Sequence, residues 1–264
     1  MRDALITALG VARSLRIYYG NRSRRRAMDA LHARFLRPGD LAFDIGAHVG
    51  DRVASFRRLG ARVVAVEPQP ALARVLRFFY GRDRLIAIEP IAVGRSEGEI
   101  ELKLNLPNPT VATASDDFIK AAKGAAGWVE QRWTRTVSVP MTTLDVLIAR
   151  HGLPRFAKID VEGFEDEALA GLSQPLPALS LEFTTIQRGV ARKAIARLAA
   201  LAPYSFNAAL GEGHRLEHSE PLDAGGISRW LDSLPVEANS GDVYASLDRE
   251  SLRGAVDQHP RVPC

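Results

Sequence analysis

The chain has very little cysteine and no long apolar run. Cys264 is the single cysteine among 264 residues, so no disulfide can form within the chain, and we expect a reducing, cytoplasmic location. No segment approaches the roughly 20 apolar residues that a membrane-spanning helix needs, so we expect no transmembrane segment. The apolar stretch 4–12 is short and has no convincing cleavage site, which favours a helix packed on the domain over a signal peptide.

Charge of one sign is not concentrated along the chain either. Lys and Arg number 35 and Asp and Glu number 31, for a formal net charge of +4. Because the two signs are interspersed, we expect no nucleic-acid partner. The one dense basic run, residues 21–26, is typical of a solvated loop or helix face, and contact with an anionic substrate or a membrane surface is the less favoured alternative.

The hydrophobic content of 46% is sufficient for one large domain. Residues 1–37 carry apolar side chains at helical spacing, interrupted at Gly20, before Pro38 and Gly39 end the second helix. We therefore expect an N-terminal helical extension over 1–37 and one domain over 38–264. Two insertions are expected in that domain, at about 95–140 and 211–241.

Short apolar runs alternate with segments of helical periodicity through the domain. The predicted strands of the main sheet are 41–45, 62–66, 85–88, 156–161 and 178–183, followed by an antiparallel pair at 204–210 and 242–247. The runs 98–104 and 136–140 alternate between apolar and polar residues, which predicts antiparallel edge strands in the first insertion. This order predicts a doubly wound α/β sheet, in which ligands bind beyond the carboxyl ends of the strands.

The stretch 41–51 is the most informative part of the chain. An apolar strand, a turn with Gly46 and Gly50, a helix and a second strand ending at Glu67 form a β-α-β unit typical of nucleotide-binding sheets. The dinucleotide fingerprint G-x-G-x-x-G has a glycine where Asp44 stands here. A carboxylate there repels a pyrophosphate and suits a cationic cofactor such as S-adenosylmethionine, because two unit charges about 4 Å apart attract by roughly 4 kcal/mol at an effective dielectric of 20.

Glu67 lies 23 positions after Asp44, close to the spacing at which such folds place the acid that binds ribose hydroxyls. Pro68 sets the turn that follows. Simpler roles stay open for both acids: Glu67 as an ordinary acid at a strand end, and Asp44 as the cap of the following helix.

With these residues in view, the chain resembles the FkbM family of S-adenosylmethionine-dependent methyltransferases over about residues 38–183. The motifs that carry the resemblance are FDIGAHVGD at 43–51, VEP at 66–68, IAVG at 91–94, TLD at 143–145 and KIDVEGFE at 158–165. Each motif alone is a weak signal, and five in order are a strong one. The resemblance implies a class I methyltransferase fold, which is a Rossmann-like, mostly parallel sheet of seven strands with helices on both faces.

The resemblance also implies a cofactor site on the matching positions. Asp44, Gly46 and Gly50 would hold the methionine part, Glu67 the ribose, and Ala92 with its neighbours would border the adenine. The predicted cofactor-binding residues are Asp44, Gly46, Ala47, His48, Gly50, Glu67, Pro68, Ala92 and Asp160.

One position departs from the family pattern. Members often have Asn two positions before Ala92, where this chain has Pro90. Adenine recognition would then depend on backbone groups or on Glu89. For His48, contact with the cofactor or substrate is one hypothesis, and a hydrogen-bonding role within the turn is the simpler alternative.

The predicted catalytic residues are Asp160, Glu162 and Glu182, which follow neighbouring strands. Side chains two positions apart share one face of a strand, so Asp160 and Glu162 point to the same cleft if strand geometry continues through them. These carboxylates act either as a general base or as ligands for a divalent metal, and the sequence selects neither. Lys158 either neutralises them or takes part in catalysis.

Family members mostly methylate hydroxyl oxygens, so the leading hypothesis is an O-methyltransferase that acts on a small metabolite, sugar or glycan. A binding protein that keeps the cofactor fold without catalysis is one alternative, and an NAD-dependent oxidoreductase is another. The set of Asp44, Glu67 and Asp160 argues against the first alternative, and Asp44 argues against the second. The acceptor is expected to be selected by the two insertions, and Trp128, Trp133 and Trp230 are expected to anchor these insertions more than to stack on a sugar.

Overall fold

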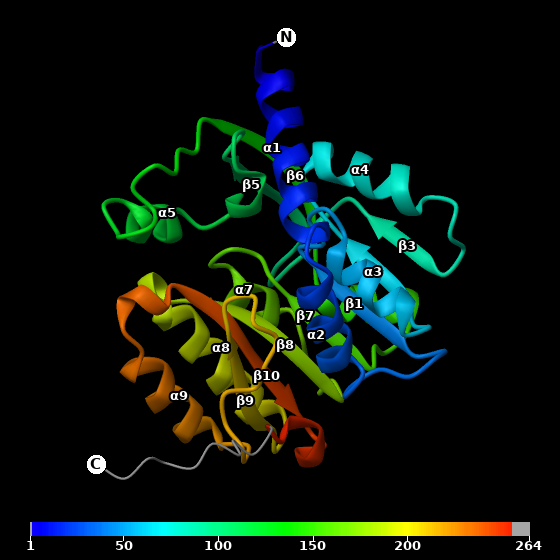
Figure 1. Ribbon diagram of the computed structural model, residues 1–264, viewed down its shortest axis with the longest axis vertical. Coiled ribbons are helices and arrows are strands. Elements are labelled where there is room, and N and C mark those ends of the chain that lie inside the picture. Colours follow the sequence, from blue (N-terminus) through cyan, green and yellow to red (C-terminus); the bar gives the residue numbers. More distant parts are fainter. Residues whose placement is uncertain (1, 255–264) are drawn as a thin grey trace.

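Seven strands form the main sheet, in the order β3-β2-β1-β7-β8-β10-β9 (Figure 1). The computed structural model describes residues 2–254, so Cys264 lies outside the described residues. The strands are β1 (Leu41–Ile45), β2 (Arg62–Val66), β3 (Ile86–Glu89), β7 (Phe156–Ile159), β8 (Ala178–Thr184), β9 (Ser205–Leu210) and β10 (Ser240–Ser246). Strand β10 runs antiparallel to β8 and β9, and the other neighbouring pairs are parallel. The predicted sheet of seven mostly parallel strands is confirmed.

Helices cover both faces of this sheet because its inner strands are apolar on both sides. The helices are α1 (Arg2–Tyr19), α2 (Arg22–His32), α3 (Asp51–Arg58), α4 (Pro70–Tyr80), α5 (Asp116–Ala122), α6 (Leu144–His151), α7 (Glu165–Ala170), α8 (Arg188–Leu201) and α9 (Ala224–Ser233). Residues of α6 to α9 pack with Phe43 and Ile45 on one face. Residues of α2, α3 and α4 pack with Ala42 on the other face (Figure 1).

A second, smaller sheet follows β3 and has the order β4-β6-β5. Its strands are β4 (Ala92–Val93), β5 (Gly98–Leu104) and β6 (Arg135–Thr142). Strands β5 and β6 pair antiparallel, with Ile100 opposite Val139, so the two alternating runs do pair as predicted. They form a sheet of their own and do not extend the main one. The short 3-10 helices are η1 (Pro109–Val111), η2 (Thr185–Gln187), η3 (Val236–Ala238) and η4 (Arg249–Leu252).

The N-terminal segment folds as α1 and α2, which meet at Asn21. The Asn21 side chain caps α2 by accepting a hydrogen bond from the Arg24 N–H. Within residues 2–254, no helix is long and apolar enough to cross a membrane. Val11 of α1 packs against Val49 and Leu72 of the domain, and further contacts of this segment are part of the site described next.

Candidate active site

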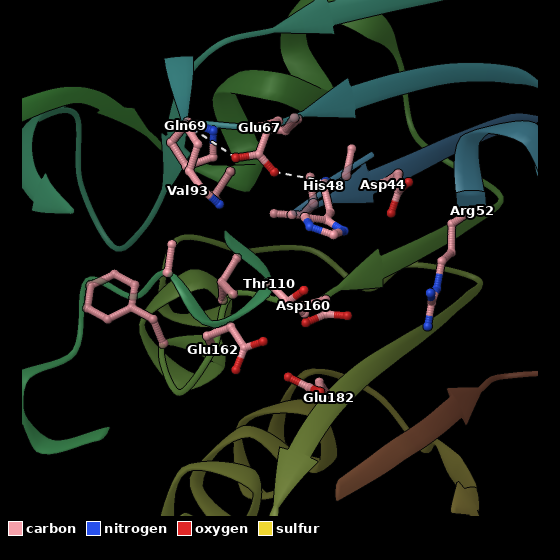
Figure 2. A pocket seen from close by; sticks show the side chains of 18 of the residues that line it. Asp44, His48, Arg52, Glu67, Gln69, Val93, Thr110, Asp160, Glu162 and Glu182 are labelled. Atoms are coloured by element: carbon pink, nitrogen blue, oxygen red, sulfur yellow. Dashed lines mark hydrogen bonds between the residues drawn. The ribbon is translucent and has the colours of Figure 1, made fainter. Parts of the chain in front are cut away.

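One pocket of about 1120 Å³, including its part open to solvent, lies beyond the carboxyl ends of β1, β2, β7 and β8 (Figure 2). Most of the predicted site residues line it together: Asp44, Gly46, Ala47, His48, Glu67, Pro68, Ala92, Asp160, Glu162 and Glu182. Gly50 does not line the pocket. A side chain there would come within 2.6 Å of the Tyr80 ring, so Gly50 is needed for close packing of α3 on α4.

Gly46 allows two turns of the site to approach each other closely. Its φ of +86° is a left-handed conformation, which glycine adopts without steric cost. A Cβ atom at this position would lie 1.7 Å from the carbonyl oxygen of Asp160. The turn after β1 and the turn after β7 therefore pack backbone to backbone, and this contact brings Asp44 and Asp160 to one pocket.

Glu67 is held in place by the backbone on both sides of it. Its Oε2 accepts a hydrogen bond from the His48 N–H at 2.8 Å, and its Oε1 accepts one from the Gln69 N–H at 2.8 Å (Figure 2). Burial raises the pKa of the Glu67 carboxyl to about 7, although these two hydrogen bonds favour its ionised form. The side chain is thus fixed in orientation at the pocket wall and is ready to bind a polar group.

Asp44 and His48 each carry a buried polar atom that has no hydrogen-bond partner within residues 2–254: the Oδ2 of Asp44 and the Nε2 of His48. Burial, and next the neighbouring charge of Asp51, raise the pKa of Asp44 to about 7. Burial lowers the pKa of His48 to about 4, so its ring is neutral near pH 7. Unpartnered polar atoms are rare in protein interiors, and their position in the pocket wall indicates that a ligand supplies the missing partners.

Asp160, Glu162 and Glu182 form an acidic cluster at the other side of the pocket. Each offers one carboxylate oxygen, and the three oxygens lie within 4.8 Å of one another. Strand geometry does not continue through Asp160 and Glu162, since β7 ends at Ile159, but both residues line the pocket. The chain turns there because Glu162 and Gly163 have φ values of +52° and +82°, and this turn directs the Glu162 carboxylate to the cluster (Figure 2).

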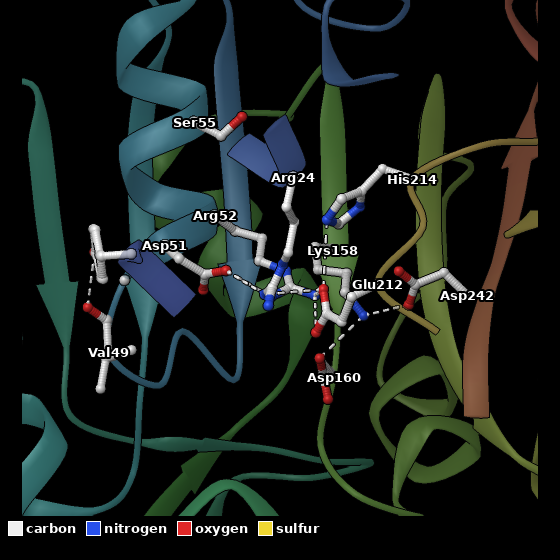
Figure 3. A network of polar contacts seen from close by, with 12 residues as sticks. Arg24, Val49, Asp51, Arg52, Ser55, Lys158, Asp160, Glu212, His214 and Asp242 are labelled. Carbon is white, nitrogen blue, oxygen red and sulfur yellow. Dashed lines mark hydrogen bonds and ion pairs between the residues drawn. The ribbon is translucent and has the colours of Figure 1, made fainter. Parts of the chain in front are cut away.

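Lys158 neutralises part of this cluster. Its Nζ lies 3.2 Å from the Oδ2 of Asp160 and 2.6 Å from the Oδ1 of Asp242 (Figure 3). Burial opposes ionisation of Asp160, but Lys158 and then Arg52 outweigh it and lower the Asp160 pKa. Burial and the charge of Asp160 instead raise the pKa of Glu162 and of Glu182 well above the usual range. The charged form is therefore favoured at Asp160 and disfavoured at Glu162 and Glu182.

A second polar network, which the sequence did not indicate, borders the pocket and includes Arg24 of the N-terminal segment (Figure 3). Arg52 lies 2.8 Å from Asp51 and 3.1 Å from Glu212. Arg24, from the basic run at 21–26, lies 3.1 Å from the same Glu212 carboxylate. The expectation of a solvated helix face is wrong for Arg24, because the loop after β9 brings Glu212 over it and leaves its side chain 14% exposed.

Tyr18 joins this network to the pocket. The guanidinium carbons of Arg24 and Arg52 lie 4.8 and 5.9 Å from the centre of its ring, and the His48 ring packs against it edge-on. Tyr18, Arg52 and Glu212 all line the pocket. Arg52 adjoins the glycine motif and was recognisable there, whereas no local pattern connects residues 18 and 212.

Glu89 is not placed to recognise adenine. It does not line the pocket, and its Oε1 lies 2.7 Å from the Nε2 of His151 and 3.0 Å from Arg150. Pocket residues near Ala92 are instead apolar or amide-bearing: Ile91, Val93, Leu102, Ala112 and Gln69.

The three tryptophans pack within the fold. Trp128 and Trp133 contact Phe118, and Trp230 contacts Phe183. None of them lines the pocket described above, in agreement with an anchoring role.

A model of the methyltransferase FkbM domain matches residues 44–198, which is more than half of the chain. The comparison with curated proteins gives no match. Among solved structures, the chain is similar to an O-methyltransferase from Bacillus cereus, with 12% identity, a TM-score of 0.44 and coverage of 89% of both chains. It is also similar to precorrin-6y C5,15-methyltransferase from Geobacter metallireducens, with 12% identity, a TM-score of 0.40 and coverage of 83% of this chain and 87% of that chain.

Proposed function

The chain belongs to the FkbM methyltransferase family, and we propose that it transfers the methyl group of S-adenosylmethionine to a hydroxyl oxygen of a small metabolite or glycan. The observation that carries the proposal is the division of one pocket into two acidic ends. Asp44 and Glu67 lie at the ends of β1 and β2, and the cluster of Asp160, Glu162 and Glu182 lies across the pocket from them (Figure 2). One end suits the cofactor, and the other suits an acceptor whose proton must be removed.

The residues present fit this cofactor. The unpartnered Oδ2 of Asp44 is suited to accept a hydrogen bond from the ammonium group of the methionine part, and charged partners make such bonds stronger. The fixed carboxylate of Glu67 retains acceptor capacity for ribose hydroxyls. Arg52 lines the same pocket and offers a guanidinium group to the methionine carboxylate.

S-adenosylmethionine, when bound, supplies an electrophilic methyl group on a positively charged sulfur. The protein's part is to position the acceptor oxygen in line with that methyl group, and positioning of this kind lowers barriers by several kcal/mol. A carboxylate of the acidic cluster would take the hydroxyl proton while the methyl group passes from the sulfur to the oxygen and S-adenosylhomocysteine leaves. General-base catalysis of this kind typically contributes about 10²–10⁴ in rate. The charge of Lys158 favours the ionised form of Asp160, and this negative charge would attract the positively charged sulfur.

The NAD-dependent oxidoreductase alternative is disfavoured by Asp44. Its carboxylate is buried, with 2% of the residue exposed, at the position where a dinucleotide fold places a glycine beside the pyrophosphate. Two negative groups would then meet in a site of low dielectric, where their repulsion is strongest.

The test is an assay of methyl transfer from S-adenosylmethionine with a methyl label. The acceptors are sugars, phenols and hydroxy acids, each paired with its deoxy analogue. We expect the label to appear only on acceptors with a free hydroxyl, and we expect Glu182→Gln to lower turnover while binding of S-adenosylhomocysteine is kept. Equal labelling of a hydroxyl acceptor and its deoxy analogue would place the methyl group on another atom and contradict the proposal.

A further inference from the structure

The acidic cluster contains more carboxylate than the neighbouring cation can neutralise. The Nζ of Lys158 is within ion-pair distance of Asp160 and Asp242, and no ion pair to Glu162 or Glu182 is formed by any residue within 2–254. Three ionised carboxylates at one point repel one another unless a positive charge joins them. The two glutamates are therefore left without a counter-charge.

Glu162 is the most informative member of the cluster. Only 6% of the residue is exposed, and its carboxylate makes no hydrogen bond with the described part of the chain, where its backbone carbonyl accepts one from the hydroxyl of Thr113. The side chain is nevertheless turned toward Asp160 and Glu182 (Figure 2). A buried carboxylate without a donor, aimed at two others, indicates that the missing partner is a cation.

We propose that Asp160, Glu162 and Glu182 bind one divalent metal ion of the magnesium, manganese or calcium class. Such hard cations take oxygen ligands at about 2.0–2.6 Å, so ligand oxygens on one ion lie at most about 4–5 Å apart, which matches the mutual limit of 4.8 Å found here. Three protein oxygens leave further coordination positions for water and the acceptor. The role of the ion in holding the acceptor rests on the proposed function, whereas the binding of the ion does not.

Metal binding at this site can be measured without a catalytic assay. Ligands must lose their protons to bind a cation, so metal binding depends on pH and releases protons. Proton release on binding is therefore a readout that does not depend on methyl transfer.

The experiment is a calorimetric titration of the full chain with Mn²⁺ in two buffers of different ionisation enthalpy, with and without S-adenosylhomocysteine. We expect one Mn²⁺ per chain and release of protons. Glu162→Gln and Glu182→Gln should each weaken binding at least about tenfold, a loss that is typical even for outer-sphere partners. Glu89→Gln is the matched control, because Glu89 is partly buried at a strand end and pairs with His151 outside the cluster; it should bind Mn²⁺ as the natural chain does.

The outcomes separate this inference from the proposed function. A chain that binds S-adenosylhomocysteine but no Mn²⁺ overturns the metal site alone, as does Mn²⁺ binding that Glu162→Gln and Glu182→Gln leave unchanged. A chain that binds Mn²⁺ at this cluster but no S-adenosylhomocysteine keeps the metal site and contradicts the proposed function. Circular dichroism and the melting temperature of each variant show whether a lost signal comes from unfolding, and in that case Glu182→Asp, which keeps the charge, replaces the failed variant.

Discussion

Replacing Asp44 by asparagine should weaken cofactor binding and at the same time stabilise the protein. The carboxylate is buried and its Oδ2 has no hydrogen-bond partner within the described chain. A hydrogen bond to a charged group contributes about 1.5–3 kcal/mol. At pH 8, Asp44→Asn should therefore weaken binding of S-adenosylhomocysteine by about 10- to 150-fold.

The pH dependence of binding follows from the pKa of about 7 that burial gives Asp44. The ionised fraction of such a group is about nine-tenths at pH 8 and about one-tenth at pH 6. If the ligand ammonium binds only the ionised form, the apparent Kd rises about tenfold between pH 8 and pH 6. Glu67, whose pKa is also raised to about 7, adds a similar factor. Between pH 8 and pH 6 the affinity of the natural chain for S-adenosylhomocysteine should therefore fall up to about 100-fold, and that of Asp44→Asn only about tenfold.

The Asp44→Asn substitution should raise the stability of the protein although it weakens cofactor binding. The folded pKa of Asp44 lies above its ordinary value of 3.8, so the folded state binds more protons than the unfolded state between about pH 4 and pH 7. Stability falls as the pH rises through this range, by about 4 kcal/mol as an upper limit. Asparagine does not ionise and so avoids this loss of stability, but it buries an amide. We therefore expect the free energy of unfolding of Asp44→Asn to be about 1–3 kcal/mol higher than that of the natural chain at pH 8.

Calorimetric titration with S-adenosylhomocysteine at pH 6, 7 and 8, together with urea unfolding at each pH, measures both effects. An unchanged Kd at pH 8, or an unchanged slope of Kd with pH, would refute the role given to Asp44. Loss of stability at pH 8 would show that its carboxylate has a partner in the folded protein.

Three further predictions concern the framework of the pocket. Gly46→Ala should prevent folding or cost more than about 3 kcal/mol in urea unfolding, because its Cβ would lie 1.7 Å from the Asp160 carbonyl; Gly39→Ala, with a similar φ of +90° and no atom within 4 Å, should cost only about 1–2 kcal/mol. Lys158→Met should cost about 3–5 kcal/mol near neutral pH, because it leaves buried carboxylates unpaired; a smaller loss would mean that solvent reaches them. Tyr18→Ala should weaken S-adenosylhomocysteine binding about two- to fivefold by releasing two guanidinium contacts, whereas Tyr18→Phe should not, and equal effects of the two substitutions would show that the ring is not the cause.

Local sequence patterns predicted much of the fold and one side of the site. The strands at 41–45 and 62–66 have the predicted bounds, since short runs that are apolar on both faces are typical of inner parallel strands. The acids at the ends of these strands follow from the same pattern, because the carboxyl ends of parallel strands meet at one edge of the sheet.

What the sequence did not reveal depends on chain reversals and on distant contacts. The turn at Glu162 requires a positive φ in a residue that is not glycine, and strand periodicity alone does not predict it. The pairing of Arg24 with Glu212 joins residues almost 190 positions apart. The run 21–26, with four arginines among six residues, is therefore equally compatible with a solvated face and with a buried contact. Such contacts are set by the packing of α2 against the loop after β9.

The most direct test of the account is a crystal structure of the chain with S-adenosylhomocysteine. We expect the ammonium group to lie against Asp44, the ribose hydroxyls to bind Glu67, and the sulfur to face the cluster of Asp160, Glu162 and Glu182. A ligand bound in another pocket, or in this pocket with its sulfur turned away from the acidic cluster, would contradict it.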